Sequence, residues 1–208
     1  MKVIEEKEQI VMNPNEDPSE IGQQFFYGDG RKKSYRKAFP YLHKAAKAGD
    51  PHCQNLVGYS YELGLGIEKN IQLALFWYKQ AAKNNDQEGL FNLALRYEKG
   101  EGVKLDLRKA FSLYKRGAEL GDACAQCNLG VAYLDGLGTK QNLTEGIKWL
   151  RKAARQGDDK AQYTLGMSYI DGEGVRKNLR LARIWLGKAS QQGHKKATAE
   201  LGRILGKK

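Results

Sequence analysis

Apolar and small residues recur along the chain at helical spacing, and glycines interrupt them at regular intervals. In residues 123–135 they follow the i, i+4, i+5, i+8 spacing of one helical face, at Ala125, Leu129, Gly130 and Tyr133. A second amphipathic stretch follows in residues 143–156, with a Gly-x-Gly pair between the two. Glycine readily accepts the positive φ of a helix C-cap. The pattern therefore predicts two helices joined by a glycine turn.

This helix pair recurs every 36 residues without insertion or deletion. Glycine or asparagine holds its first position, at Gly49, Asn85, Gly121, Gly157 and Gly193. We predict five full repeats and a capping half-repeat, at 13–48, 49–84, 85–120, 121–156, 157–192 and 193–208. One helix pair cannot bury its own apolar face, so neighbouring repeats must stack. The predicted fold class is an all-α solenoid of helix-turn-helix repeats over residues 13–208.

The repeat carries a motif that extends beyond its hydrophobic pattern. In the fifth repeat its residues are Ala161, Leu165, Gly166, Tyr169, Gly172, Gly174, Val175, Ala182, Trp185 and Ala189. The motif resembles the Sel-one-like repeat family, a relative of tetratricopeptide repeats, over about residues 13–208. The first repeat departs most, because Pro18 and Phe25 replace the usual opening and Pro40 interrupts its second helix. The formation of its first helix is therefore left open.

This resemblance implies a right-handed superhelix that acts as a protein-binding adaptor or scaffold and has no enzyme activity of its own. A more specific expectation is a bacterial regulator or a partner that neutralises a toxin, which some proteins of this kind become. Nothing in the residues themselves selects that version.

Charge and composition refine this interpretation. The net charge is +11, yet residues 1–24 hold two lysines against six acidic residues, so we expect an acidic, disordered arm over residues 1–12. No apolar run approaches the roughly 18 to 20 residues of a membrane helix. Three cysteines and the absence of a secretory leader favour a reduced, cytoplasmic location.

Candidate catalytic chemistry is sparse. The glycine turns follow helices rather than strands, which argues against a phosphate loop. The three histidines lack partners at a spacing that would build a triad or a metal site. Cys124 and Cys127 form a CxxC without a second pair, so we interpret them as free thiols outside the repeated packing positions, whereas Cys53 holds a small, buried one. We predict no catalytic residue, no metal and no cofactor.

A solenoid presents an extended concave surface, and by analogy with tetratricopeptide repeats its first helices line it. The fourth, seventh, eleventh and fourteenth positions of each repeat then face inward. The predicted partner-binding residues are Tyr59, Phe91, Leu95, Cys127, Val131, Leu134, Tyr163, Met167 and Ile170. Such an apolar stripe suits an amphipathic helix or an extended peptide. The alternative is that curvature buries the stripe between successive first helices. We expect a protein or peptide partner and favour a monomeric chain.

A second candidate surface lies on the outer, second helices. It is basic, with Lys79, Lys115, Arg116, Arg151, Lys152 and Arg155 recurring at a few repeat positions. Such a ridge could follow nucleic acid or an anionic surface. Acidic residues are frequent beside it and no nucleic-acid-binding motif is present, so a solvated face is the favoured interpretation and nucleic acid is not the favoured partner.

Overall fold

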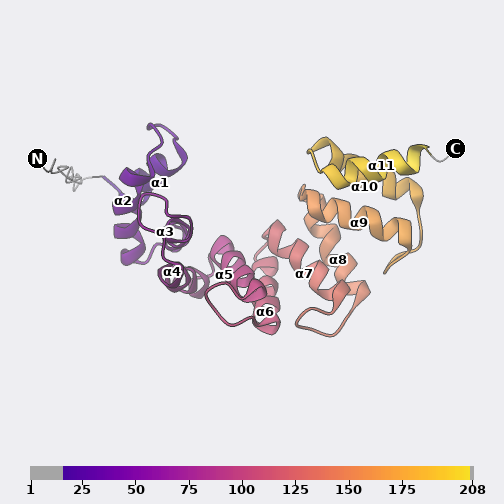
Figure 1. Cartoon of the computed structure of the whole chain (residues 1–208), viewed down its shortest axis with the longest axis horizontal. Helices are drawn as coiled ribbons and strands as arrows, with labels where there is room; N and C mark the ends of the chain where they lie inside the picture. The colour runs from indigo at the N-terminus through magenta and orange to yellow at the C-terminus, as the bar shows by residue number, and fades with distance from the viewer. Residues whose placement is uncertain (1–15, 207–208) are drawn as a thin grey trace, which may run out of the picture. The chain divides into compact units, whose positions relative to one another are not determined.

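The computed structural model describes residues 16–206, which form helices joined by turns (Figure 1). The expected acidic arm at residues 1–12 lies outside the described residues. Two compact units divide the chain between Gly89 and Leu90. The first unit holds α1 (Pro18–Tyr27), α2 (Tyr35–Ala48), α3 (Pro51–Leu63) and α4 (Ile71–Lys83). The second holds α6 (Leu107–Glu119), α7 (Ala123–Asp135), α8 (Leu143–Arg155), α9 (Asp159–Asp171), α10 (Leu179–Gln191) and α11 (Lys195–Gly206), while α5 (Gln87–Lys99) spans the boundary.

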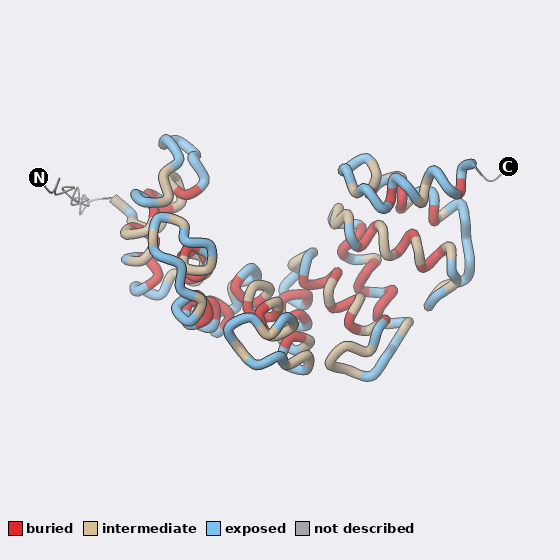
Figure 2. The backbone as a smooth tube through the Cα atoms, in the orientation of Figure 1, coloured by how far each residue is buried: buried red, intermediate tan, exposed pale blue. Residues whose placement is uncertain are grey.

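The helices alternate as the repeat predicts, and the all-α fold class is confirmed. α7 has the predicted bounds, and α8 is one residue shorter than its predicted stretch because Gln156 serves as its C-cap. In the first repeat α1 forms with ten residues, and α2 continues through Pro40. Each second helix packs against the first helix of its own repeat, and within each unit also against the first helix of the next repeat. Buried stretches occur on each helix, with exposed turns between them (Figure 2).

Aspartate begins most first helices, because its carboxylate satisfies a free backbone N–H group of the first turn. Asp50 accepts from the Cys53 N–H at 2.6 Å, and Asp158 accepts from the Ala161 N–H at 2.7 Å. His194 takes this role before α11, where its Nδ1 accepts from the Ala197 N–H at 3.1 Å. These caps set the start of α3, α5, α7, α9 and α11 at the same repeat position, whereas α1 begins three residues later in its repeat.

Glycine allows the two helices of a repeat to approach closely. A Cβ atom on Gly130 would lie 2.7 Å from Leu150 of α8, and one on Gly166 would lie 2.7 Å from Leu186 of α10. Ordinary Cβ contacts are longer than 3.4 Å, so no larger residue fits at these positions without a shift. These glycines therefore lie where the first helix of a repeat meets its second helix.

The second glycine of the turn has a different role, because it contacts the preceding repeat. Gly66 has a φ of +74° and lies against the first turn of α2, where an added Cβ would overlap the carbonyl oxygen of Tyr35. Gly138 lies in the same way against Leu107 of α6. At these turns the backbone of one repeat therefore packs directly against the backbone of the preceding repeat.

A ladder of side-chain amides, which the sequence analysis missed, also links the repeats. Gln162 donates to the carbonyl of Ala154 in the preceding repeat at 3.1 Å, and its own oxygen accepts from Gln192 at 2.9 Å. Gln126 and Gln156 repeat this arrangement, with 2.8 Å between their amides. Leucine holds both equivalent positions in the third repeat, at 90 and 120. The recurrence of glutamine at one repeat position was the signal for this ladder.

Candidate protein-binding face

The first helices α5, α7 and α9 of the second unit carry eight of the nine predicted partner-binding residues. These eight are Phe91, Leu95, Cys127, Val131, Leu134, Tyr163, Met167 and Ile170. The ninth, Tyr59, lies on α3 in the first unit, where it is 38% exposed and its ring centroid is 6.4 Å from that of Phe26.

Burial divides the eight residues into two buried residues and six half-buried ones. Cys127, at the seventh position, and Leu134, at the fourteenth, are each 4% exposed and belong to the core that α7 forms with α8 and α9. Leu134 fills the space beside Gly146, where an added Cβ would lie 2.7 Å from it. Neither side chain therefore offers surface to a partner, and Cys127 is a packing residue, contrary to the sequence interpretation.

The eleventh position of the repeat is the accessible one. Leu95, Val131 and Met167 hold it in the second unit, and each is half-buried; Arg203 holds it on α11 and is exposed. Phe91, Tyr163 and Ile170 are also half-buried and pack against core clusters, and Val131 packs against the same cluster as Ile170. The Tyr163 ring stacks on His194, with 4.6 Å between centroids. Packing therefore takes up part of the apolar stripe, whereas the row at the eleventh position remains half-buried, and so partly accessible, in all three repeats.

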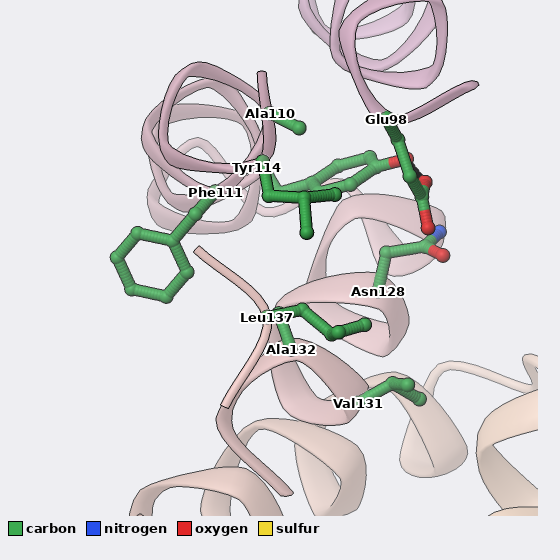
Figure 3. A pocket seen from close by; sticks show the side chains of 9 residues that line it. Glu98, Ala110, Phe111, Tyr114, Asn128, Val131, Ala132 and Leu137 are labelled. Carbon is green, nitrogen blue, oxygen red and sulfur yellow. Dashed lines mark hydrogen bonds between the residues drawn. The ribbon is translucent and has the colours of Figure 1, made fainter. Parts of the chain in front are cut away.

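A narrow pocket lies beside this row, between α6 and α7 (Figure 3). Glu98, Tyr114 and Asn128 converge at one end of it, and the Tyr114 hydroxyl donates to the Glu98 carboxylate at 2.5 Å. Burial raises the pKa of Tyr114 well above its usual value, and this hydrogen bond adds to the effect. The free volume is about 20 Å³, enough for about one water molecule. The pocket is therefore too small for an organic substrate.

The cysteines lack the surroundings of reactive thiols. Cys53 and Cys127 are buried and Cys124 is exposed, and all three are free. Burial raises the pKa of Cys53 to about 12, and burial with nearby aspartates raises the pKa of Cys124. A reactive thiol needs a lowered pKa, which a cationic neighbour usually provides. Among residues 16–206 no group of three or more His, Cys, Asp and Glu side chains could hold a metal ion.

A polar cluster in the first unit joins residues from three successive repeats. The Tyr27 hydroxyl lies 3.2 Å from Nε2 of His52, whose Nδ1 lies 3.9 Å from an Asp86 oxygen. Burial, aided by the charge of Glu88, raises the pKa of Tyr27 to about 12. Tyr27 therefore stays protonated and serves as a hydrogen-bonding group. The sequence placed His52 on the inner face but gave no signal for Tyr27, whose repeat position holds unrelated residues elsewhere.

The basic residues of the second helices are partly engaged within the chain. Lys152 lies 4.0 Å from the Trp149 ring centroid, Arg151 donates to the Tyr169 hydroxyl at 3.1 Å, and Lys115 pairs with Glu119 at 4.0 Å. Lys79 and Arg155 are exposed and Arg116 is half-buried. Lys79 belongs to the first unit and the other five to the second.

Stacked helix pairs joined by glycine turns at a regular period of the sequence define a helical-repeat protein. The Sel1 repeat model matches residues 21–50, 51–86, 87–122, 125–158 and 159–194, and the chain therefore belongs to the Sel1 repeat family. Proteins with Sel1 repeats are generally protein-interaction scaffolds without catalysis of their own.

Solved structures agree with this assignment. A Sel1 repeat protein from Oxalobacter formigenes is 33% identical, with a TM-score of 0.85 over 93% of this chain and 81% of that one. A protective antigen with an SLR fold from uropathogenic Escherichia coli is 36% identical, with a TM-score of 0.81 over 90% of this chain; the match spans 40% of the antigen's length. An immunity protein from Pseudomonas aeruginosa is 21% identical, with a TM-score of 0.60 over 95% of this chain and 74% of that one. This last likeness shows the fold alone.

No curated protein sequence matches the chain. Within residues 16–206, no helix combines the length and the apolar character that crossing a membrane requires.

Proposed function

We propose that the chain is a non-enzymatic scaffold that holds a protein partner along the first-helix face of its second unit. The observation that carries the proposal is the accessible apolar row formed by Leu95, Val131 and Met167, one residue from each of three successive repeats. Regularly spaced apolar contacts suit an amphipathic helix or an extended peptide as guest. Met and aromatic side chains are also enriched at the cores of protein interfaces.

The charges along the same face favour one orientation of the bound guest. Glu98 lies at the α5 end, whereas Lys160, Lys196 and Arg203 lie on α9 and α11, and these three are exposed. A guest with basic residues toward α5 and acidic residues toward α11 would complement this face. The three free thiols favour a reducing compartment for this activity. The immunity-protein likeness rests on the fold alone and does not select a toxin as the partner.

The test compares two charge-introducing variants in quantitative affinity capture from native lysate. Leu95→Glu with Met167→Glu places carboxylates in the accessible row at positions that are already half-buried. Lys152→Glu with Arg155→Glu reverses charge on the outer helices and serves as the matched control. We expect the proteins captured by the unaltered chain to be lost by the first variant and retained by the second. A circular dichroism melt of each variant establishes that its helices are intact.

The opposite pattern would overturn the proposal. Capture that survives the inner-face variant and fails with the outer-face variant would assign binding to the basic ridge. Nuclease treatment then identifies nucleic acid as its ligand if capture also disappears on treatment.

A further inference from the structure

The second helices of the first unit, α2 and α4, are basic and carry no acidic side chain. Together they hold six Lys and Arg residues and no Asp or Glu, and all six are exposed: Arg36, Lys37, Lys44, Lys47, Lys79 and Lys83. None of the six forms an ion pair with another residue of the described range 16–206. On α6 and α8, by contrast, ion pairs neutralise three lysines, at Lys109–Asp106, Lys115–Glu119 and Lys148–Glu145. The positive charge of α2 and α4 is therefore left to the solvent or to a partner.

Two large apolar side chains are exposed on the outer side of α4. Phe76 is 49% exposed and Leu73 is 39% exposed, and their spacing to Lys83 places all three on one side of the helix. In the third and fourth repeats the positions of Leu73 and Phe76 hold polar residues, namely Lys109, Ser112, Glu145 and Lys148. In the fifth repeat Leu181 packs against the core and only Ile184 is exposed. Packing of the repeat therefore does not require apolar residues at these two positions.

The neighbouring helix α2 continues this surface. At the repeat positions of Leu73, Gln80 and Lys83 it carries Lys37, Lys44 and Lys47. Aromatic contacts join the two helices, because the Trp77 ring centroid lies 5.5 Å from that of His43 on α2 and 5.1 Å from that of Phe76. The exposed apolar pair is thus bordered by lysines of both helices. We call this surface the basic-apolar face, with Lys44, Lys47, Leu73, Phe76, Lys79 and Lys83 as its residues.

The apolar pair and the lysines together select among anionic partners. Nucleic acid would satisfy the lysines through its phosphates, but it would leave Leu73 in water, because an aliphatic side chain has no flat face on which a base can stack. A bilayer surface with anionic headgroups satisfies both parts of the face. The apolar side chains enter the boundary between headgroups and acyl chains, while the long lysine side chains keep their amines among the headgroups.

We propose that the basic-apolar face docks the first unit reversibly on a membrane surface rich in anionic lipid. The binding needs both contributions, because a few lysines or two apolar side chains alone do not hold a protein on a bilayer. Of the basic ridge predicted from the sequence, Lys79 is the residue that takes part. The face lies on second helices of the first unit, whereas the proposed protein-binding row lies on first helices of the second unit. Each surface can therefore be tested without the other.

Cosedimentation of the full chain with phospholipid vesicles tests this proposal. We expect binding to vesicles of phosphatidylcholine with phosphatidylglycerol, little binding to phosphatidylcholine alone, and weaker binding as salt is raised, because salt screens exposed charges. Lys79→Glu with Lys83→Glu should lower the partition coefficient at least about tenfold, since each lysine near an anionic surface contributes about fivefold. Leu73→Ser with Phe76→Ser should lower it at least about fivefold, because two partly exposed apolar side chains no longer leave the water.

Each variant has a matched control. Lys109→Glu with Lys115→Glu makes the same change of net charge on α6 of the second unit. Leu63→Ser removes a side chain of α3 that is 49% exposed, the same fraction as for Phe76. Both controls should bind vesicles nearly as the unaltered chain does, and a circular dichroism melt of each variant establishes that its helices are intact.

Three results would overturn the proposal. The first is equal binding to the two kinds of vesicle, or binding to neither. The second is a loss in the controls as large as in the variants of the face, since net charge alone would then explain the binding. The third is full binding by Leu73→Ser with Phe76→Ser. If vesicles do not bind and an oligonucleotide is held through Lys79 and Lys83, the face belongs to nucleic acid instead.

Discussion

The glycine turn between α3 and α4 offers a direct test of how the repeats stack. Gly64 and Gly66 lie two residues apart, with φ values of +76° and +74°. A Cβ on Gly64 would make its nearest contact at 3.6 Å, an ordinary distance. On Gly66 it would overlap the Tyr35 carbonyl and lie 2.7 Å from the Arg36 nitrogen. Alanine at the two positions therefore differs mainly in the contact with the preceding repeat.

The expected difference in stability between the two variants comes from overpacking, because the other effects of alanine are common to both positions. Placing alanine in the left-handed region costs about 1 to 2 kcal/mol at either position. The gain from a less flexible unfolded chain is also common to both variants. Overpacking adds about 1 to 3 kcal/mol at Gly66 alone, because the atoms it meets belong to backbone and cannot rotate away. We expect Gly66→Ala to lower the free energy of unfolding by about 1 to 3 kcal/mol more than Gly64→Ala.

Urea unfolding followed by circular dichroism at 222 nm measures this difference. Gly30→Ala is a further control, since Gly30 holds the position of Gly66 one repeat earlier, has a φ of +71° and has no atom within 4 Å of its Cβ. It should behave like Gly64→Ala. Equal losses for Gly64→Ala and Gly66→Ala, within about 0.5 kcal/mol, would refute the idea that this turn fixes the contact between repeats.

Two other predictions concern caps and the amide ladder. Burial disfavours the charge of Asp50, but hydrogen bonds from Cys53 and Ser19 outweigh it and hold its pKa below the usual 3.8, whereas burial raises the pKa of Asp86 above 3.8. The Asp50 carboxylate therefore stabilises the folded chain above about pH 3.8, and this stability is lost as the pH falls through the pKa of Asp50 in the folded chain. The sign is reversed at Asp86, because ionising a carboxyl group with a raised pKa costs folding free energy as the pH rises through its folded pKa. Asp50→Asn should therefore destabilise the chain at pH 7, Asp86→Asn should be neutral or stabilising there, and urea unfolding at pH 3 should show a smaller difference. For the ladder, Gln162→Leu should cost about 1 to 3 kcal/mol, because it removes two hydrogen bonds worth about 0.5 to 1.5 kcal/mol each, while the Ala154 carbonyl keeps the Gly157 N–H and the Gln192 amide keeps the Gly157 carbonyl. Gln162→Leu and Gln192→Leu should couple by about 0.5 to 1.5 kcal/mol in a double-mutant cycle, because both remove the one hydrogen bond that joins the two amides, and strictly additive losses would contradict this.

The regularity of the repeat explains why the fold was predictable. Glycines that need positive φ, such as Gly136, and glycines that need close approach, such as Gly130, recur at fixed spacing and mark turns and helix contacts. Both requirements arise from the backbone geometry at a single position, so the presence of glycine at that position reveals them in the sequence. The amide ladder could have been predicted in the same way, because glutamine recurs at one repeat position.

Accessibility of the binding face was not predictable in the same way. Leu134 and Ile170 hold equivalent positions, yet only Leu134 is buried, because Gly146 leaves space for it beside α8. Burial on this face thus depends on the size of residues on neighbouring helices. The Tyr27–His52–Asp86 cluster had no signal for a different reason: Asp86 recurs as a helix cap, but Tyr27 and His52 have no counterpart at their positions in the other repeats.

The amide ladder has a consequence for how such a chain can grow. Residues 121–156 carry both Gln126 and Gln156, and the next repeat carries Gln162 and Gln192 at the same positions. A duplicated copy of residues 121–156, inserted in frame after Gln156, would find a matching amide and a matching glycine turn at both of its junctions. The junction chemistry therefore suits lengthening by whole blocks, and each added block would bring its own residue of the half-buried row at the eleventh position.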